Sequence, residues 1–367
     1  MSTRAPAAIG QRLEEVDTPA LIIDLDSFEK NISSLSRAVG NTVRVRAHAK
    51  THKCPEIAKR QIAAGAAGMC CQKVSEAEAL VEGGIQDVLV SNEVVGAQKI
   101  ARLAALAERA HIGVCVDNRD NLREIEASGA KLDVYVEIEV GMRRCGVFPG
   151  EPAVALARAI AASKTLRFAG LQAYHGRAQH LRSMEERRAA IAAAAKAVEL
   201  TKSLLKKEAI DCPIVTGAGS GTFMFEIESR AWNEIQPGSY VFMDVDYARN
   251  QWTAPLPRFE HALFVLATVM SRPSPDLAIV DAGLKASSVD SGMPTVWQRD
   301  GLNYSGASDE HGKIEIASGA RAPALGDKLL LVPGHCDPTV NLYDWYVCVR
   351  RGVVEALWPI TARGAIT

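Results

Sequence analysis

Residues 43–54, Val43-Arg-Val-Arg-Ala-His-Ala-Lys50-Thr-His-Lys-Cys54, decide the fold. Apolar residues at 43, 45 and 47 alternate with polar ones, which predicts a strand. Pro55 follows and is typical of the first turn of a helix. Lys50 therefore stands at the carboxyl end of an early strand. In barrel enzymes, this end of the strands carries the chemistry.

The amine of Lys50 is the first candidate for chemistry. A lysine can form a Schiff base with an aldehyde cofactor if its amine is partly neutral. Five positive or imidazole side chains crowd it in sequence, and positive neighbours would lower its pKa. They are Arg44, Arg46, His48, His52 and Lys53. The alternative is a basic surface loop, because most lysines are exposed to solvent.

Strand-like and helix-like segments alternate over most of the chain. After a short strand at 20–24, strands are expected near 43–47, 67–71, 86–91, 112–116, 132–138, 167–173, 213–216 and 234–242. Helices are expected near 27–38, 55–64, 75–83, 95–108, 119–128, 151–163, 185–206 and 222–231. Strands separated by helical sequence predict a (β/α)8 barrel of the TIM type. An open doubly wound sheet is the alternative, but no G-x-G-x-x-G motif follows the first strand.

The pattern of hydrophobic residues changes near residue 247. Long helical periods stop, and apolar runs at 262–270, 277–281, 328–332 and 345–350 alternate with turns rich in Gly, Pro, Asp and Ser. This pattern predicts a mostly β C-terminal domain. We expect the barrel at 24–246 and the β-rich domain at 1–23 plus 247–367.

Composition argues against several classes of protein. A net charge of −1 over 367 residues gives no electrostatic reason to bind nucleic acid or an anionic membrane. The chain starts without an apolar signal segment, and no apolar run is long enough to span a bilayer. The eight cysteines are scattered and form neither a metal pair nor a disulfide framework. These features predict a reducing, cytoplasmic compartment.

Polar groups follow the fifth and sixth barrel strands. Arg144 lies between two glycines after the fifth strand, where its permanent charge suits a cofactor ring atom. Tyr174-His-Gly-Arg177-Ala-Gln-His180 follows the sixth strand and brings a phenol, two imidazoles and an amide together. Several such groups at one strand end favour a site over structural roles. A surface arginine and satisfied structural histidines are the alternatives.

Glycine-rich turns follow the last two barrel strands. The first is Thr216-Gly217-Ala-Gly219-Ser220-Gly221-Thr222, and the second contains Gly238-Ser239-Tyr240. Glycine lets the backbone approach a phosphate, and a following helix start offers free N–H groups. Barrels often bind phosphate in this region. The sequence therefore predicts a barrel that binds a phosphorylated ligand beside a lysine.

His335 and Asp337 form the candidate metal site of the second domain. In extended backbone, residues i and i+2 point the same way, so both side chains could bind one divalent ion while Cys336 points away. Only two mixed ligands suggest a largely hydrated Mn²⁺, Mg²⁺ or Co²⁺ rather than structural zinc. A hydrogen-bonded turn with an Asx cap is the alternative.

Taken together, these motifs resemble the D-threonine aldolase family, which includes the 3-hydroxy-D-aspartate aldolases and is related to the D-serine dehydratases. The resemblance runs from about residue 17 to residue 364. It rests on His48-Ala-Lys-Thr-His-Lys-Cys-Pro, Cys70-Cys-Gln-Lys-Val-Ser-Glu-Ala-Glu, Arg144-Cys-Gly-Val, Gln172-Ala-Tyr-His-Gly, Gln179-His, Gly238-Ser-Tyr, Asp281-Ala-Gly-Leu-Lys and Pro333-Gly-His-Cys-Asp-Pro-Thr. It implies an alanine-racemase-like pyridoxal-phosphate barrel with a β domain, usually a homodimer.

The resemblance also implies a role for each matching residue. Lys50 would hold pyridoxal 5'-phosphate through a Schiff base, and His180 would be the base near the substrate hydroxyl. His335 and Asp337 would bind the divalent metal; the dehydratase relatives carry Cys where Asp337 stands, so aspartate favours the aldolase branch. The other expected cofactor contacts are Gln72, Arg144, Tyr174, Thr216, Gly217, Gly219, Gly238, Ser239 and Tyr247.

The implied reaction is retro-aldol cleavage of a D-3-hydroxy amino acid to glycine and an aldehyde. The substrate would be D-threonine, D-allo-threonine or 3-hydroxy-D-aspartate. Arg177 could bind a side-chain carboxylate and so favour hydroxyaspartate, or it could face solvent. The same groups also allow a dehydratase that gives a 2-oxo acid and ammonia.

Three other classes of protein are alternatives to this interpretation. A non-enzymatic pyridoxal-phosphate carrier would be a single barrel, and the second domain with His335 and Asp337 argues against it. An unrelated barrel enzyme could act on a sugar phosphate. A racemase of this fold would need a second base on the opposite face, and the sequence offers no clear candidate.

Overall fold

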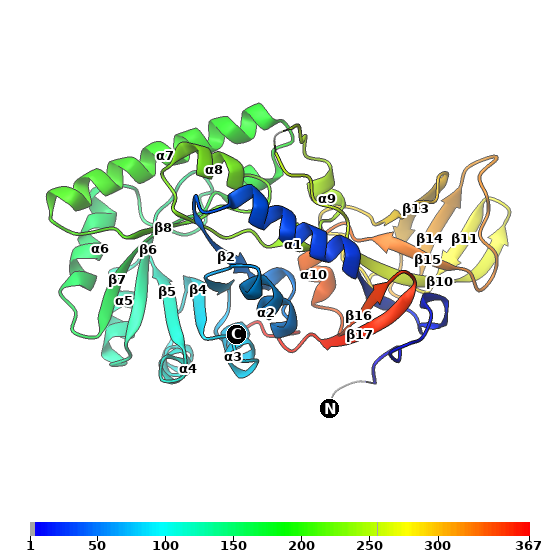
Figure 1. Ribbon diagram of the computed structural model, residues 1–367, viewed down its shortest axis with the longest axis horizontal. Helices are drawn as coiled ribbons and strands as arrows, with labels where there is room; N and C mark the ends of the chain where they lie inside the picture. The colour runs from blue at the N-terminus through cyan, green and yellow to red at the C-terminus, as the bar shows by residue number, and fades with distance from the viewer. Residues whose placement is uncertain (1–3, 255) are drawn as a thin grey trace.

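Eight parallel strands form a barrel in the first part of the chain, at the left of Figure 1. The computed structural model describes residues 4–254 and 256–367. The strands are β2 (Arg44–His48), β3 (Gly68–Cys71), β4 (Asp87–Glu93), β5 (His111–Val116), β6 (Leu132–Glu137), β7 (Leu166–Ala173), β8 (Ile214–Gly217) and β9 (Glu234–Ile235). From β2 to β8, strands that follow one another in sequence are neighbours in the sheet, and β9 pairs with β2. The predicted TIM-type barrel is confirmed.

Helices alternate with these strands and cover the outside of the barrel. They are α1 (Leu25–Val39), α2 (Pro55–Ala63), α3 (Val74–Glu82), α4 (Ala97–Ala107), α5 (Arg119–Ala127), α6 (Glu151–Ala161), α7 (Met184–Lys207) and α8 (Phe223–Ser229). Strands β3, β5 and β6 are buried at nearly every position, as expected when helices cover one side and the barrel interior the other. Inside the barrel, a small cluster forms from Cys70, Leu89, Cys115, Tyr135 and Ala169.

The last barrel strand is shorter than expected. A strand was expected over 234–242, but β9 ends at Ile235 and a short 3-10 turn, η4 (Ser239–Val241), follows. Pro237 has no N–H to donate to a ladder. Two backbone bonds join the flanks of β9 to β8, with Asn233 N 3.2 Å from Val215 O and Gln236 N 2.7 Å from Gly217 O. The early end of β9 leaves residues 236–241 free to form a loop over the barrel mouth.

A mixed sheet of nine strands makes up the second part of the molecule. Its strands are β1 (Ala20–Asp24), β10 (Leu263–Ser274), β11 (Leu277–Val280), β12 (Thr295–Val296), β13 (Leu302–Ala307), β14 (Gly312–Ile316), β15 (Lys328–Val332), β16 (Trp345–Arg350) and β17 (Val353–Pro359). The expected mostly β character is confirmed. Strands β12, β13, β14 and β17 were not expected, because short alternating segments between turns give a weak signal.

The N-terminal strand β1 belongs to this second sheet. It lies between β10, with which it pairs antiparallel, and β16, with which it pairs in parallel. An N-terminal contribution to the β-rich domain therefore agrees with the strand order, although residues 1–3 lie outside the described residues. The exact boundaries at 24 and 246 stay a prediction.

Two short helices carry residues of the second region toward the barrel mouth. They are α9 (Val245–Ala248) and α10 (Cys336–Val340), and α10 packs on the 3-10 turn η2 (Ala49–Thr51). This contact places the segment after β15 over the end of β2. None of the described helices has the combination of length and apolar character needed to cross a bilayer.

Candidate functional site

A cavity of about 540 Å³ opens at the carboxyl ends of the barrel strands. Nine of the thirteen predicted site residues line it. They are Lys50, Gln72, Arg144, Tyr174, His180, Gly219, Gly238, Ser239 and Tyr247. Residues from widely separated parts of the sequence thus meet at one end of the barrel, because parallel strands bring their carboxyl ends to the same edge.

Lys50 follows β2 in the turn η2, and its amine contacts the Oδ2 atom of Asp337 on α10. The side chain of Lys50 is 38% exposed, whereas that of Asp337 is 14% exposed. The second carboxylate oxygen of Asp337, Oδ1, is buried without a hydrogen-bond partner in the described part of the chain. A buried carboxylate oxygen of this kind is suited to a cation.

The electrostatics of Lys50 differ from the expectation. Its enclosure favours the neutral amine, but the Asp337 carboxylate outweighs this, so the pKa of Lys50 is raised rather than lowered. Burial opposes the charge on Asp337 too, yet contact with Lys50 lowers the pKa of Asp337 to about 2. The basic neighbours in sequence do not set the pKa of Lys50, because side chains alternate along a strand. Arg46, for example, lies 3.0 Å from Glu234 and 2.5 Å from Asp87.

Two glycine-rich loops border the cavity, and the one that contains Gly238 lies against η2. The backbone N–H groups of Gly219, Ser220 and Gly238 donate to no group in the described residues, so they are free for a ligand. A Cβ atom on Gly238 would lie 2.6 Å from Oγ1 of Thr51, so only glycine allows this close approach. These loops are suited to a phosphate.

Thr216 and Gly217 of the same loop do not line the cavity. The Oγ1 atom of Thr216 accepts a hydrogen bond of 2.8 Å from Gln236. A Cβ atom on Gly217 would lie 2.1 Å from the carbonyl oxygen of Ala173. The surroundings of both residues are therefore explained by packing between barrel strands, and their contact with a cofactor stays a prediction.

Arg144 and Tyr174 form one wall of the cavity. The guanidinium carbon of Arg144 lies 5.6 Å from the centre of the Tyr174 ring, within range of a cation–π contact. Gln72 lies on another side, where its Nε2 atom is 3.0 Å from Nε2 of His48. Burial, together with the charge of Lys50, lowers the pKa of His48 well below its usual value. His48 is therefore a neutral imidazole in this wall.

His180 is held by a carboxylate that the sequence analysis did not single out. Its Nδ1 atom lies 2.5 Å from Oδ2 of Asp246. Burial disfavours the charge on Asp246, but hydrogen bonds from Arg182 and His180 outweigh this and lower the pKa of Asp246. Because an ionised carboxylate only accepts hydrogen bonds, Nδ1 must donate. The Nε2 atom of neutral His180 is then free to accept a proton.

His335 has a similar partner. Its Nδ1 atom lies 2.8 Å from Oδ2 of Asp290, and the pKa of Asp290 is lowered by this contact despite partial burial. When Nδ1–H donates to Asp290 in the neutral ring, Nε2 carries the lone pair and is the atom that could bind a metal. A carboxylate on the far nitrogen is common for a histidine that binds a metal.

The backbone at His335 and Asp337 is only partly as expected. His335 is extended, with φ −145° and ψ 127°, but α10 begins at Cys336 and includes Asp337. The expected extended i, i+2 arrangement is therefore wrong. The Cys336 side chain is buried beneath the helix, as expected from its predicted orientation away from the site.

Several wall residues were not predicted as site residues. They include His48, Gln172 and Gln236, while Asp246 and Asp290 support His180 and His335. The period-two pattern places His48 on a strand, but it does not show which side chains of different strands meet. Asp290 is 45 residues from His335 in sequence, and no local pattern connects them.

Family comparisons cover both parts of the chain. Residues 23–246 match the alanine racemase N-terminal domain. Residues 262–349 match a putative serine dehydratase domain.

Individual proteins are similar over nearly the whole length. A crystal structure of D-threonine aldolase from Filomicrobium marinum has a TM-score of 0.97, with 52% identity over 100% of both chains. D-threonine aldolase from an Arthrobacter species is 50% identical over 98% of this chain and 96% of its own. 3-Hydroxy-D-aspartate aldolase from Paracoccus denitrificans is 47% identical over 98% and 95%. D-threo-3-hydroxyaspartate dehydratase from a Delftia species is only 28% identical, over 94% and 97%.

Proposed function

Because this chain belongs to the alanine racemase N-terminal domain family and, within it, to the group of D-threonine and 3-hydroxy-D-aspartate aldolases, we propose that it is a lyase that cleaves D-3-hydroxy amino acids to glycine and an aldehyde. The observation that carries this proposal is the meeting of Lys50, His180 and Asp337 at one barrel mouth. An amine, an imidazole and a carboxylate are the groups that a retro-aldol cleavage needs.

The cavity fits pyridoxal phosphate. We propose that Lys50 binds its aldehyde carbon and that the free N–H groups of Gly219, Ser220 and Gly238 bind its phosphate. Arg144, Gln72 and Tyr174 would border its ring. When bound, this cofactor supplies an electron sink for the electrons of the breaking Cα–Cβ bond.

His335 and Asp337 fit a divalent cation, and we propose Mn²⁺, Mg²⁺ or Co²⁺. The free Nε2 of His335 and the unpartnered Oδ1 of Asp337 are the donor atoms. A divalent ion there would supply Lewis-acid activation of the substrate hydroxyl. Lys50 competes for the same carboxylate, so binding of Lys50 to a cofactor would release Asp337 for a cation.

His180 is the proposed base. Its Nδ1 donates to Asp246, which fixes the tautomer and leaves Nε2 to take the proton of the substrate hydroxyl. Tyr247 supports the ring, with the two ring centres 5.4 Å apart. Asp246 acts here as a positioning residue, because it touches His180 and not the cavity.

Arg177 would favour 3-hydroxy-D-aspartate over D-threonine as the substrate. It lines the cavity and is exposed to solvent, and no salt bridge is recorded for it within the described residues. A guanidinium with no protein partner can pair with the second carboxylate of 3-hydroxy-D-aspartate. D-Threonine has a methyl group at this position and would gain nothing from Arg177.

A metal-assisted dehydratase is the second candidate function. The match of residues 262–349 to a putative serine dehydratase domain favours it. Both reactions need the same cofactor and the same activated hydroxyl, so the products must decide between them.

A product assay tests the proposal. Purified protein with pyridoxal phosphate and Mn²⁺ receives D-threonine, L-threonine or 3-hydroxy-D-aspartate, with EDTA in a parallel sample. We expect glycine with acetaldehyde or glyoxylate from the D-substrates, loss of activity with EDTA, and no activity in Lys50→Ala. Lys164→Ala changes an exposed lysine on the barrel surface and is the control. A 2-oxo acid with ammonia would establish the dehydratase instead.

The cytoplasmic location and the homodimer are also proposals. All eight cysteines lie within the described residues and are free, which suits a reducing compartment. The homodimer rests on the family resemblance alone, and light scattering of the purified protein would test it.

A further inference from the structure

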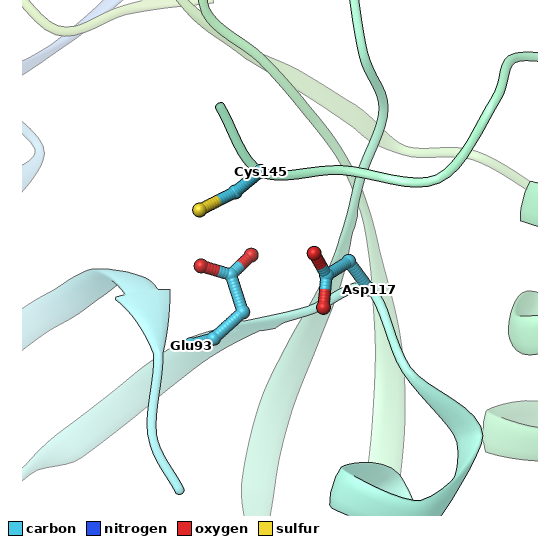
Figure 2. Close-up of side chains that lie close together, drawn as sticks. All are labelled: Glu93, Asp117 and Cys145. Carbon is cyan, nitrogen blue, oxygen red and sulfur yellow. The ribbon is translucent and has the colours of Figure 1, made fainter. Parts of the chain in front are cut away.

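A second group of side chains of the kinds that can bind a metal lies at the ends of three adjacent barrel strands. Glu93 ends β4, Asp117 follows β5, and Cys145 lies in the loop after β6. One potential ligand atom from each lies within 4.8 Å of the others. Figure 2 shows the carboxylates of Glu93 and Asp117 and the thiol of Cys145 turned toward a common space.

A fourth side chain, Glu137 at the end of β6, is a neighbour of Glu93 and has a buried oxygen without a partner. Glu137 is only 3% exposed, and its Oε2 atom has no hydrogen-bond partner in the described part of the chain. Both carboxylate oxygens of Glu93 are buried without partners as well. The carboxyl groups of Glu137 and Glu93 lie close enough for their charges to interact, so the buried oxygens belong to neighbouring carboxylates.

Within the described residues, one salt bridge reaches the carboxylates of the cluster. Arg144 is the recorded ion-pair partner of Glu137, at 3.7 Å, and it is 40% exposed. Asp117 accepts a hydrogen bond of 3.0 Å from the backbone N–H of Gly146. One shared proton would supply a donor for only one of the three unpartnered oxygens, whereas a divalent cation could interact with several at once.

We propose that Glu93, Asp117, Glu137 and Cys145 bind a second divalent cation, separate from the one proposed at His335 and Asp337. The thiol selects the kind of ion. Mg²⁺ and Ca²⁺ take oxygen ligands, whereas Zn²⁺ and Co²⁺ also bind thiolate sulfur. Binding would release the thiol proton of Cys145 to solvent and form the metal–sulfur bond.

The site has a structural consequence for the cavity. The cation would join the ends of β4, β5 and β6 to the loop that carries Arg144. Glu137 contacts Arg144, and Arg144 lines the cavity. The second ion would therefore hold this cavity wall in place without touching the substrate.

Metal content tests this proposal independently of activity. The protein loaded with pyridoxal phosphate is stripped with chelator, equilibrated with Zn²⁺ and analysed by mass spectrometry of the metal. We use Asp337→Asn as the background, because it removes the other proposed site. We expect about one Zn²⁺ per chain in this background and about none after adding Glu93→Gln. Adding Glu124→Gln, which changes an exposed carboxylate on α5, is the control and should retain the ion.

Thermal unfolding gives a second readout. Excess Zn²⁺ should raise the Tm of the Asp337→Asn protein by about 3 °C or more, and Glu93→Gln should abolish this shift. Cys145→Ser should weaken binding of Zn²⁺ more than binding of Mn²⁺. The proposal is overturned if the Asp337→Asn protein binds no Zn²⁺, or if it binds the same amount with and without Glu93→Gln. Loss of aldolase activity alone bears on the proposed function and not on this site.

Discussion

The amine of Lys50 contacts the carboxylate of Asp337, which lies 287 residues away in sequence. Lys50 comes from the barrel and Asp337 from the helix after β15. This contact joins the proposed cofactor site to the proposed metal site. It also accounts for the raised pKa of Lys50 and the lowered pKa of Asp337.

Asp337→Asn should remove metal-dependent activity. The amide keeps the size of the side chain but loses the charge that binds a cation, so we expect kcat to fall by about 100-fold or more. Binding of pyridoxal phosphate should persist, as measured by its absorbance at about 420 nm. Asp309→Asn, on an exposed turn, is the control. Full activity of Asp337→Asn with EDTA present would contradict the metal role.

His180→Gln should lower kcat by about 100-fold to 10,000-fold, because it removes the proposed base. Asp246→Asn should cause a smaller fall in kcat with little change in KM, since the imidazole stays but loses its fixed tautomer. Asp246→Glu should recover part of the loss. Steady-state kinetics on D-threonine measure these effects, and an unchanged kcat in His180→Gln would assign the base to another residue.

Gly238→Ala should weaken binding of pyridoxal phosphate by about 10-fold or more. The added methyl group would lie 2.6 Å from Oγ1 of Thr51, so the loop must move away from the phosphate position. Spectroscopic titration of the apoprotein measures the Kd. Gly306→Ala is the matched control, because nothing lies within 4 Å of a Cβ atom there. Equal affinities in the two variants would show that this loop does not bind the phosphate.

Arg177→Ala should change substrate preference. We expect kcat/KM to fall by about 10-fold or more for 3-hydroxy-D-aspartate, because a carboxylate contact is lost, and by less than about 3-fold for D-threonine. Arg158→Ala, on the outer helix α6, should leave both values unchanged. If Arg177→Ala retains the wild-type preference between the two substrates, Arg177 does not select the substrate.

Glu226→Gln should stabilise the protein at high pH. Glu226 is fully enclosed in α8, and burial raises its pKa to about 8 despite a hydrogen bond from Thr222. The folded chain thus keeps a proton that the unfolded chain releases near pH 4.5. Stability is therefore lost as the pH rises from that value through about 8.

The glutamine variant should have a free energy of unfolding higher by about 1–3 kcal/mol at pH 8. At pH 4 the difference should be much smaller, because Glu226 is then protonated in most molecules of both the folded and the unfolded state. Urea unfolding at the two pH values measures this. A difference that does not depend on pH would mean that Glu226 is not the titrating group.

The barrel was predictable because its signals are local. Alternation around Val43 and Val45 defines a strand, and the helical periods between strands define the crossovers. The expected helix at 185–206 corresponds to α7 at Met184–Lys207. Two local predictions were wrong. The last barrel strand was expected to reach residue 242, but it ends at Ile235, shortly before Pro237. Asp337 was expected in extended backbone, but it lies in α10, which begins at Cys336.

Sequence by itself determined the fold class, the position of Lys50 after an early strand, and the glycine-rich loops. Each of these depends on neighbours in the chain. Only the tertiary structure decided that Asp246 holds His180, that Asp290 holds His335, and that Asp337 raises the pKa of Lys50. It alone placed Glu93, Asp117 and Cys145 together. The physical reason is that electrostatic interactions and ligand geometry depend on distances in space, and barrel closure brings together groups that are far apart in sequence.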